Sequence, residues 1–371
     1  MSRVRSVDVY VARHHLSRPR VYAVAANADR ESLLVRVADQ DGVAGWGETY
    51  VRAGLPEAAA RAGELLVGRD PAARRELARL VADASGSSWA ASALVNAIDD
   101  LRARQLGVSV AALHGGAVRK DVQAYAAGSG YRPDRTPEQS WLEELEELTG
   151  QGFRAVKLRI GRHDQAMELA GLTAARRAFP DLQLMADANA AYTLPQSLHA
   201  AEALADLGFS FLEEPMPQSG YAGYERLTPL SPIAIAGGEL LESRVLALEA
   251  VARGAFDVVQ PDPSICGGIA DARFIAEMSS LHGVRCVPHT CNGAVALAAT
   301  LQLVALLPDP TLSPATEAPL LEWDSGENPL RTDLLREPLV LDAGRVSVPS
   351  GPGLGVDVDE TVLQRYAQKV A

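Results

Sequence analysis

The chain has 371 residues, of which 47% are hydrophobic and 22% charged, a composition typical of a soluble globular protein with room for more than one domain. Its 47 acidic and 35 basic residues leave a formal charge of −12, which argues against nucleic-acid or membrane partners. The three cysteines lack metal-finger spacing, and the charged N-terminal stretch is unlike a signal peptide. Since no apolar run is long enough to cross a bilayer either, we expect a cytoplasmic protein.

The first 120 residues predict an antiparallel sheet followed by helices. Strand-like runs occupy 4–12 and 31–40, and Asp41-Gly42 predicts a hairpin turn into a strand over 43–48. Apolar residues at three- and four-residue spacing then predict three helices, near 56–67, 71–84 and 89–105. This part of the chain is expected to form an α+β domain.

From about residue 121, short strands alternate with helical stretches. The predicted strands are 122–128, 153–160, 182–187, 209–214, 233–239, 256–262, 284–289 and 319–323. Eight such units predict an α/β fold of the (β/α)8 TIM-barrel type. A doubly wound open sheet is the alternative, but no Gly-rich dinucleotide loop follows the first strand.

The last segment carries strand pieces and turns from Leu339 onward, which predict a return of the chain to the first domain. We therefore expect a capping domain over 1–120, a barrel over 121–324 and a returning C-terminal segment over 325–371.

Three consecutive predicted strands end in acids, Asp187, Glu213 and Glu239, spaced one βα unit apart. Strand ends of a βα barrel gather on one face, where active sites lie. Carboxylates brought together there repel one another unless a cation neutralises them, and all-oxygen ligands with room for water suit Mg²⁺. The alternative is that each acid caps a helix or sits in a solvated loop. Asn189 is expected to point the same way as Asp187 and to contact a ligand, unless it only starts a helix.

Acid–base groups follow on the flanking strands. Asp262 and His289 are expected at neighbouring strand ends, where the aspartate would orient the imidazole and raise its basicity. On the other flank, Lys157 and Arg159 share one face of a strand because side chains alternate with period two. The alternatives are a structural histidine and plain salt bridges to the carboxylates.

Taken together, these motifs resemble the enolase superfamily in its mandelate racemase subgroup, over nearly the whole chain. The motifs are Lys-x-Arg, Asp-Ala-Asn, Glu-Glu-Pro, Gly-Gly-Glu, Pro-Asp-x-x-x-x-Gly-Gly and Pro-His. The resemblance implies that Asp187, Glu213 and Glu239 bind Mg²⁺, which holds a small carboxylate substrate. A base then removes the α-proton to give a metal-stabilised enediolate.

The resemblance also assigns roles. Asp262 and His289 match the family's Asp–His dyad, and the electrophilic glutamate of the last strand matches Glu322, with Glu317 as its rival. One departure stands out: the second lysine of the subgroup's Lys-x-Lys motif, the opposite-face base, is replaced by Arg159. Arginine stays protonated and is a poor base, so Arg159 is better suited to clamp a carboxylate.

One-base chemistry predicts elimination, with His289 removing the α-proton of an acid sugar to yield a 2-keto-3-deoxy acid. The enzyme would then be an acid-sugar dehydratase. A racemase, epimerase or cycloisomerase using Lys157 on the second face is the runner-up, and a non-catalytic metal-binding barrel is the third alternative.

Specificity is expected to lie in capping-domain loops near 14–24 and 48–55, which carry Tyr22 and Tyr50. Arginines in these loops could meet a second carboxylate of a diacid. The predicted substrate-binding residues are Asn189, Arg159, Glu317, Tyr22 and Tyr50. Members of the family are commonly dimers or octamers, so a homo-oligomer is expected.

Overall fold

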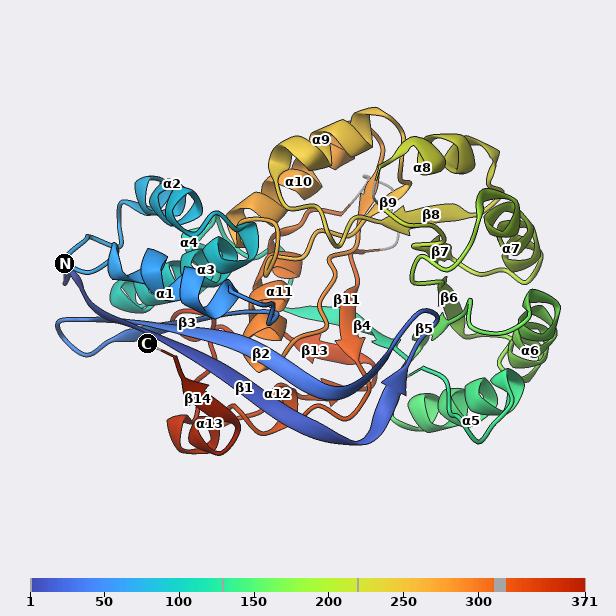
Figure 1. The fold of residues 1–371 in the computed structure, drawn as a ribbon, viewed down its shortest axis with the longest axis horizontal. Helices are drawn as coiled ribbons and strands as arrows, with labels where there is room; N and C mark the ends of the chain where they lie inside the picture. The colour runs from blue at the N-terminus through green and yellow to red at the C-terminus, as the bar shows by residue number, and fades with distance from the viewer. Residues whose placement is uncertain (1, 129, 219, 310–317, 371) are drawn as a thin grey trace.

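The computed structural model describes residues 2–128, 130–218, 220–309 and 318–370, and Figure 1 shows a capping domain packed beside a larger α/β part. The capping sheet has the strand order β14-β1-β2-β3. Its strands are β1 (Val4–Val21), β2 (Ala26–Asp39), β3 (Ala44–Thr49) and β14 (Ala367–Lys369). Its helices are α1 (Leu55–Glu64), α2 (Arg74–Ser85), α3 (Ser88–Leu106) and α4 (Val110–Leu113).

The predicted hairpin at Asp41-Gly42 is confirmed, since β2 and β3 pair antiparallel across it and Gly42 has a φ of 89°. Helix α3 lies directly against the backbone of β3. A Cβ atom on Gly45 would lie 2.2 Å from the backbone nitrogen of Leu101, and one on Gly47 would lie 1.9 Å from a backbone oxygen of α3. Glycine at both positions is therefore what lets the helix approach the sheet so closely.

The first strand is longer than the sequence predicted. Residues 14–21, expected as part of a loop, continue β1, which pairs with β2 down to Val21 through a register shift between His15 and Arg20. The hairpin reaches the barrel, because Val21 accepts a backbone hydrogen bond from Tyr131 at 2.8 Å (Figure 1). A strand pair, rather than a loop, thus carries this part of the capping domain to the barrel mouth.

The second part contains eight parallel strands in the order β11-β4-β5-β6-β7-β8-β9-β10, so the last strand pairs with the first. Among the described strands, no ladder joins β10 to β11. The strands are β4 (Asp121–Ala127), β5 (Ala155–Arg159), β6 (Gln183–Asp187), β7 (Phe211–Glu213), β8 (Ala234–Gly237), β9 (Val258–Val259), β10 (Arg285–Cys286) and β11 (Leu321–Asp324). The connecting helices are α5 (Pro137–Gly150), α6 (Gln165–Ala178), α7 (Leu194–Asp206), α8 (Ala222–Leu227), α9 (Arg244–Ala252), α10 (Ile269–Leu281) and α11 (Ala294–Leu306), with the 3-10 turn η1 (Thr228–Leu230) after α8. The eight predicted strands and the barrel-type fold are confirmed.

Strands β9 and β10 are shorter than predicted, and proline explains where they stop. Val287 still donates its backbone N–H to Val259 at 3.0 Å, but Pro261 and Pro288 have no N–H to continue the ladder. The chain leaves regular pairing there, and the following residues form the rim of the barrel.

A buried apolar layer fills the barrel interior, with contributions from each of the eight strands or the residues beside them. Its members are Tyr125, Ala155, Met185, Phe211, Ala236, Val258, Val287 and Leu320. Because side chains alternate along a strand, the residues two positions further on also face inward, above this layer. Six of these eight positions hold polar or charged side chains, which form the candidate site, and the other two hold Ala127 and Gly238.

The C-terminal segment pairs with strands of both the barrel and the capping domain. The hairpin β12 (Leu341–Asp342) and β13 (Arg345–Ser347) pairs with β4, so these strand pieces join the barrel sheet rather than the first domain as predicted. After α12 (Pro329–Thr332) and α13 (Glu360–Tyr366), strand β14 does return to the capping sheet and pairs with β1. None of the helices in the described ranges is both long and apolar enough to cross a bilayer.

Candidate active site

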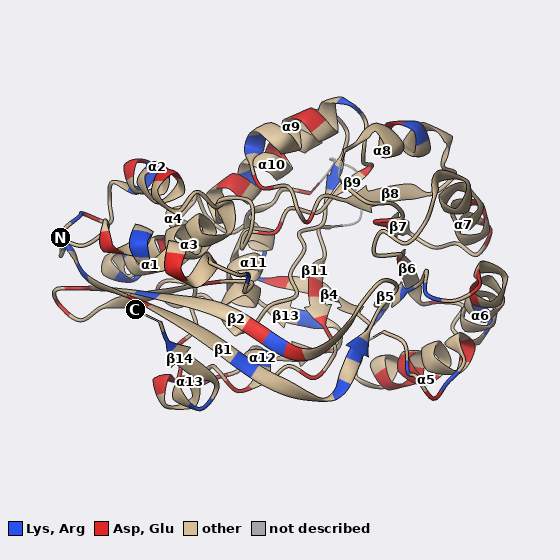
Figure 2. Cartoon of the chain, in the orientation of Figure 1, with Lys and Arg blue, Asp and Glu red and all other residues tan. Residues whose placement is uncertain are grey.

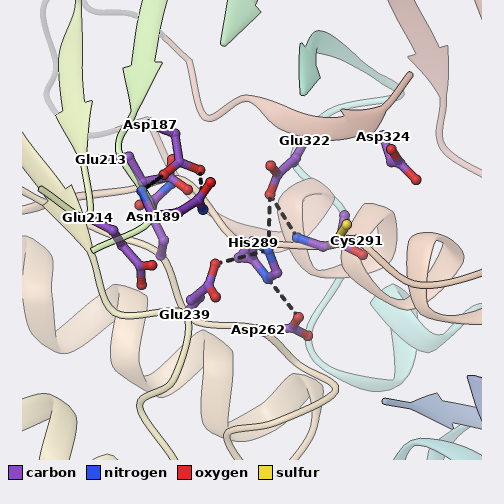
Figure 3. Close-up of polar contacts among 12 residues, drawn as sticks. Asp187, Asn189, Glu213, Glu214, Glu239, Asp262, His289, Cys291, Glu322 and Asp324 are labelled. Atoms are coloured by element: carbon purple, nitrogen blue, oxygen red, sulfur yellow. Dashed lines mark hydrogen bonds and ion pairs between the residues drawn. The ribbon is translucent and has the colours of Figure 1, made fainter. Parts of the chain in front are cut away.

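The polar groups at the barrel mouth come from successive strand ends, as alternation requires. Lys157 and Arg159 lie on β5, Asp187 ends β6 and Glu213 ends β7, and all four are buried. Figure 3 shows Asp187 and Glu213 near each other, with Glu239 directed toward His289. The structure thus gathers the predicted acids and the predicted acid–base groups at one face.

Lys157 lies at the centre of the carboxylates and is 0% exposed. Its Nζ is 2.6 Å from Glu213 Oε1, 2.8 Å from Glu322 Oε1 and 3.7 Å from Asp187 Oδ2. Burial alone would lower the pKa of Lys157, but these carboxylates outweigh burial and hold the pKa well above its ordinary value. Lys157 is therefore a fixed cation that links the ends of β6, β7 and β11.

Asp187 is held by its neighbours on both sides. Arg159 donates from Nη1 to Asp187 Oδ2, and Asn189 donates its backbone N–H to Oδ1 at 2.8 Å and its side-chain amide to Oδ2 at 3.2 Å. Asn189 adopts a φ of 43°, which turns the chain back over the carboxylate. Arg159 and Asn189, both predicted to bind substrate, thus lie directly beside the first predicted metal ligand.

The three predicted metal ligands each contact a cation in the structure. Asp187 meets Arg159, Glu213 meets Lys157, and Glu239 Oε2 lies 3.1 Å from His289 Nε2. Within the described ranges, no group of three or more acidic, histidine or cysteine side chains is arranged to hold a metal ion. Grouping the three carboxylates around one ion requires these side chains to turn away from their present partners.

The chemistry of the donor set still fits Mg²⁺. The donors are carboxylate oxygens at three adjacent strand ends, which suit a hard cation. Burial raises the pKa of Glu213, and the nearby Asp187 and Glu322 raise it further although Lys157 lowers it. The ionised form of Glu213 is therefore disfavoured where it lies, and a divalent cation bound beside it would favour that form.

His289 and Asp262 form a hydrogen-bonded dyad. His289 Nδ1 and Asp262 Oδ2 are 2.9 Å apart, and the backbone N–H of Ser264 donates to Asp262 Oδ1 at 2.7 Å. With Nδ1 donating to the aspartate, the lone pair of a neutral imidazole is on Nε2, which faces Glu239 and the barrel mouth. In Figure 3, Asp262 and Glu239 lie on opposite sides of the imidazole ring.

The charges around His289 favour its protonated form. Burial lowers the pKa of His289, but Glu239, Glu322 and Asp262 together raise it well above its ordinary value. Glu322 Oε2 is 3.8 Å from His289 Nε2 and accepts the backbone N–H of Thr290 at 3.0 Å. Burial would raise the pKa of Glu322, but Lys157 and His289 lower it, so Glu322 is held ionised.

The capping domain contacts the dyad through Tyr50, which was predicted to bind substrate. Its hydroxyl donates to Asp262 Oδ2 at 2.9 Å and lies 3.5 Å from His289 Nδ1, and the Tyr50 and His289 rings stack at 6.4 Å. The hydroxyl group therefore supports the dyad, while the ring lines a neighbouring cavity. Tyr22, also predicted to bind substrate, lies in the same cavity wall.

The loop that carries Asp262 is held by capping-domain residues that sequence reasoning missed. Thr49 donates its hydroxyl to the backbone oxygen of Ser264 at 2.6 Å. Asn96 on α3 donates to the backbone oxygen of Pro263 at 2.9 Å and accepts the N–H of Ile269 at 3.0 Å. The Pro-Asp-x-x-x-x-Gly-Gly motif shows the loop but carries no signal for which distant residues hold it.

Two further polar residues near the site, Gln260 and Glu48, were not predicted from the sequence. Gln260, two residues before Asp262 on the inward face, donates to Glu213 Oε2 at 2.7 Å, and strand alternation from Asp262 could have found it. Buried Glu48 accepts the backbone N–H groups of Gly293 and Ala296 at 2.7 and 2.8 Å and so fixes the start of α11. Glu317, the rival of Glu322, lies outside the described residues, and it is Glu322 that lies on the last strand.

Comparisons with known proteins agree with this geometry. The family model described as "Enolase C-terminal domain-like" matches residues 140–362, and "Mandelate racemase / muconate lactonizing enzyme, N-terminal domain" matches residues 6–115. The D-galactarolactone cycloisomerase of Agrobacterium fabrum is 33% identical over 374 residues, covering 98% of each protein. The D-gluconate dehydratase of Thermoproteus tenax is 29% identical and covers 90% of this chain and 69% of its own length. The crystal structure of 3,6-anhydro-D-galactonate cycloisomerase from Zobellia galactanivorans has a TM-score of 0.88 at 29% identity, covering 99% of this chain and 100% of that one.

Proposed function

Since this chain belongs to the mandelate racemase/muconate lactonizing enzyme subgroup of the enolase superfamily, a family of enzymes, we propose that it dehydrates an acid sugar to a 2-keto-3-deoxy acid. The observation that carries the proposal is the His289–Asp262 dyad. Its free imidazole nitrogen faces the mouth of the barrel beside the carboxylate cluster. This is where a base must lie to take a proton from a carbon next to a bound carboxylate.

On the opposite flank of the site, neither basic residue of β5 is an available base. Arg159 is always charged, and Lys157 is fully buried and held by Glu213 and Glu322. Racemisation needs a base on each face of the α-carbon, whereas elimination needs only one. The geometry therefore favours elimination over racemisation or epimerisation by Lys157.

Asp187, Glu213 and Glu239 would hold Mg²⁺, the metal that members of this superfamily use. Held there, Mg²⁺ would supply Lewis acidity that stabilises the negative charge developing on the substrate carboxylate. Arg159 and Asn189 lie beside Asp187 and orient that carboxylate from the β5 and β6 side. Lys157 remains paired with Glu322 and adds fixed positive charge below the substrate.

In the proposed reaction, His289 carries the proton in both steps. Glu239 is the charge that raises the pKa of His289 most, and once it turns away to hold a metal ion the neutral form of His289 becomes more accessible. Neutral His289 Nε2 takes the α-proton, and Asp262 stabilises the imidazolium through Nδ1. The same imidazolium gives its proton to the oxygen leaving from the β-carbon. The C–O bond breaks, water departs, and the resulting enol tautomerises to the 2-keto-3-deoxy acid.

Cycloisomerisation is the second candidate, favoured by the relative that matches over 98% of both chains and is named a D-galactarolactone cycloisomerase. The dyad would perform the same proton abstraction, but the leaving β-oxygen would belong to a ring. Because that oxygen stays attached to the product, the reaction is an isomerisation and releases no water.

The test is proton NMR in D₂O with Mg²⁺ and pooled aldonic acids, aldaric acids and their lactones. The proposal expects the signals of a 3-deoxy product to appear as those of a linear acid disappear; conversion of lactones alone establishes the cycloisomerase instead. Deuterium incorporation at the α-carbon with inversion of configuration and without elimination would contradict the one-base mechanism. His289→Asn is expected to abolish product formation while Mg²⁺ binding persists, which also separates catalysis from a non-catalytic metal site.

A further inference from the structure

A cluster of arginines lies where the β1–β2 hairpin meets the barrel rim. Arg20 of β1 and Arg30 of β2 approach Asp324 with closest distances of 3.6 and 2.7 Å, and Arg331 of α12 interacts with the same carboxylate. Figure 2 shows basic residues on the part of β1 that curves toward β5. One carboxylate therefore pairs with two guanidinium groups and interacts through its charge with a third, so these four side chains together keep an excess of positive charge.

Buried donors in this cluster lack hydrogen-bond acceptors. The Arg20 side chain is only 7% exposed, and its Nη1 donates to Cys291 Sγ at 2.9 Å. Among the described residues, nothing accepts a hydrogen bond from Arg20 Nε or Nη2, nor from the side-chain amide of Asn292. A buried donor without an acceptor is costly, and a charged one more so. An anionic ligand with several acceptor oxygens would satisfy these groups together.

The cluster opens onto a cavity that adjoins the catalytic dyad. The cavity has a volume of ≈ 360 Å³, and its wall includes Arg20, Tyr22, Arg30, Tyr50, Cys291 and Asn292. Two carboxylates also lie in the wall, Asp29 and Glu31, and they are paired with His15 and Arg13. Tyr50 connects it to the dyad, because its hydroxyl bonds Asp262 beside His289. The Arg20 and Arg159 guanidinium groups lie 5.3 and 5.9 Å from the ring centre of Tyr22. Tyr22 thus lies close both to an arginine at the metal-ligand end of the site and to an arginine of the capping domain.

We propose that the substrate is a dicarboxylate sugar acid whose second carboxylate binds Arg20. This inference rests on the proposed function, because it names the substrate class of the same site. The carboxylate next to the α-carbon lies at the Arg159 end, and the distal one accepts hydrogen bonds from Arg20 Nε and Nη2, with Arg30 adding charge. A guanidinium group binds carboxylate through two parallel hydrogen bonds, which a terminal hydroxymethyl group cannot accept in the same way. A monoacid of the same length leaves the buried donors unpaired and is disfavoured.

The test compares acids that differ only at the distal carbon. Galactarate is paired with galactonate and glucarate with gluconate, and each Kd is measured by titration calorimetry with Mg²⁺ in a His289→Asn background that prevents turnover. We expect the diacid of at least one pair to bind more tightly than its monoacid. Arg20→Gln should weaken binding of that diacid by about 10- to 100-fold, the range for a charge-assisted pair, and leave the monoacid Kd unchanged.

Two further variants keep the outcome unambiguous. Arg79→Gln removes a capping-domain arginine on α2 that is 86% exposed and does not line the cavity, so it controls for the loss of one positive charge and should leave both Kd values unchanged. Arg20→Lys retains the charge without the planar fork and should restore part of the diacid affinity. The inference is wrong if no diacid binds more tightly than its monoacid, or if both Arg20 variants weaken the two acids equally.

The binding test and the turnover test can give opposite results, so the role of Arg20 and the proposed reaction can be refuted independently. Turnover of aldonic acids with inert diacids would keep the proposed dehydratase and overturn the role of Arg20. Diacid-specific binding that depends on Arg20, together with an absence of α-proton exchange in the wild-type protein, would keep the dicarboxylate site and overturn the proposed reaction.

Discussion

Substitution of Asp262 by Asn tests the dyad without removing its base. Asp262 accepts hydrogen bonds from His289 Nδ1 and the Tyr50 hydroxyl at 2.9 Å each, and from the backbone N–H of Ser264 at 2.7 Å. The amide oxygen of asparagine can keep the bond to Ser264, which leaves its NH₂ group facing Nδ1. The neutral imidazole then carries its proton on Nε2, the nitrogen that must accept the substrate proton.

The expected loss follows from that wrong tautomer. Positioned general bases contribute about 10²–10⁴-fold, and an imidazole locked in the wrong tautomer forfeits up to about 10⁴. We therefore expect Asp262→Asn to lower kcat/KM by about 10²–10⁴-fold, with Mg²⁺ affinity unchanged. Tyr50→Phe, which removes one neutral donor from the same carboxylate, should cost about 10-fold or less.

The pH dependence gives a second readout of the same variant. Glu239, Glu322 and Asp262 raise the pKa of His289 against the lowering effect of burial, so removing the Asp262 charge should lower it. Because the base acts in its neutral form, activity appears as pH rises through the pKa of His289. The acidic limb of the kcat/KM profile should therefore move to lower pH in Asp262→Asn, while the plateau falls.

Deuterium exchange at the substrate α-carbon, followed by NMR across pH, is the assay, and NMR of the imidazole protons reports the pKa directly. An Asp262→Asn variant with unchanged kcat/KM and an unshifted acidic limb would refute the orienting role of Asp262. Retained exchange in His289→Asn would refute the assignment of the base itself.

Three further predictions concern stability. Lys157→Met leaves Glu213 and Glu322 without their shared cation and should lower the free energy of unfolding by about 3–5 kcal/mol at pH 7 without Mg²⁺. This loss of stability should become smaller as the pH falls and the two carboxylates become protonated. A loss that is independent of pH in denaturant titrations would contradict this explanation. Mg²⁺ at 100 times its Kd should stabilise the protein by about 2.7 kcal/mol, and an unchanged melting temperature with Mg²⁺ or EDTA would count against the metal site. Glu48→Gln weakens the acceptor of two backbone amides at the start of α11 and should cost about 1–3 kcal/mol, whereas an unchanged melting temperature would show that this contact is dispensable.

The arrangement of the site along the chain could be predicted because it depends on local patterns. Alternating short strands and helices predict the barrel, and parallel strands place Asp187, Glu213 and Glu239 at one face. Period-two alternation places Lys157 and Arg159 on the inward side of β5. The prediction of a loop over residues 14–24 was wrong for residues 14–21. These residues belong to β1, because pairing with β2 keeps the chain extended as far as Val21.

The sequence by itself determined which residues stand at the strand ends, since that depends on spacing and alternation within each βα unit. Only the tertiary structure decided which of them contact one another: Lys157 meets Glu322 across the β11–β4 closure, and Tyr50 reaches Asp262 from another domain. It also brought Arg20 to Cys291, 271 positions away along the chain, so that guanidinium nitrogens with no hydrogen-bond acceptor among the described residues lie near the segment that follows His289. Such contacts depend on how separate elements pack and how side chains turn toward one another, and no local pattern encodes them.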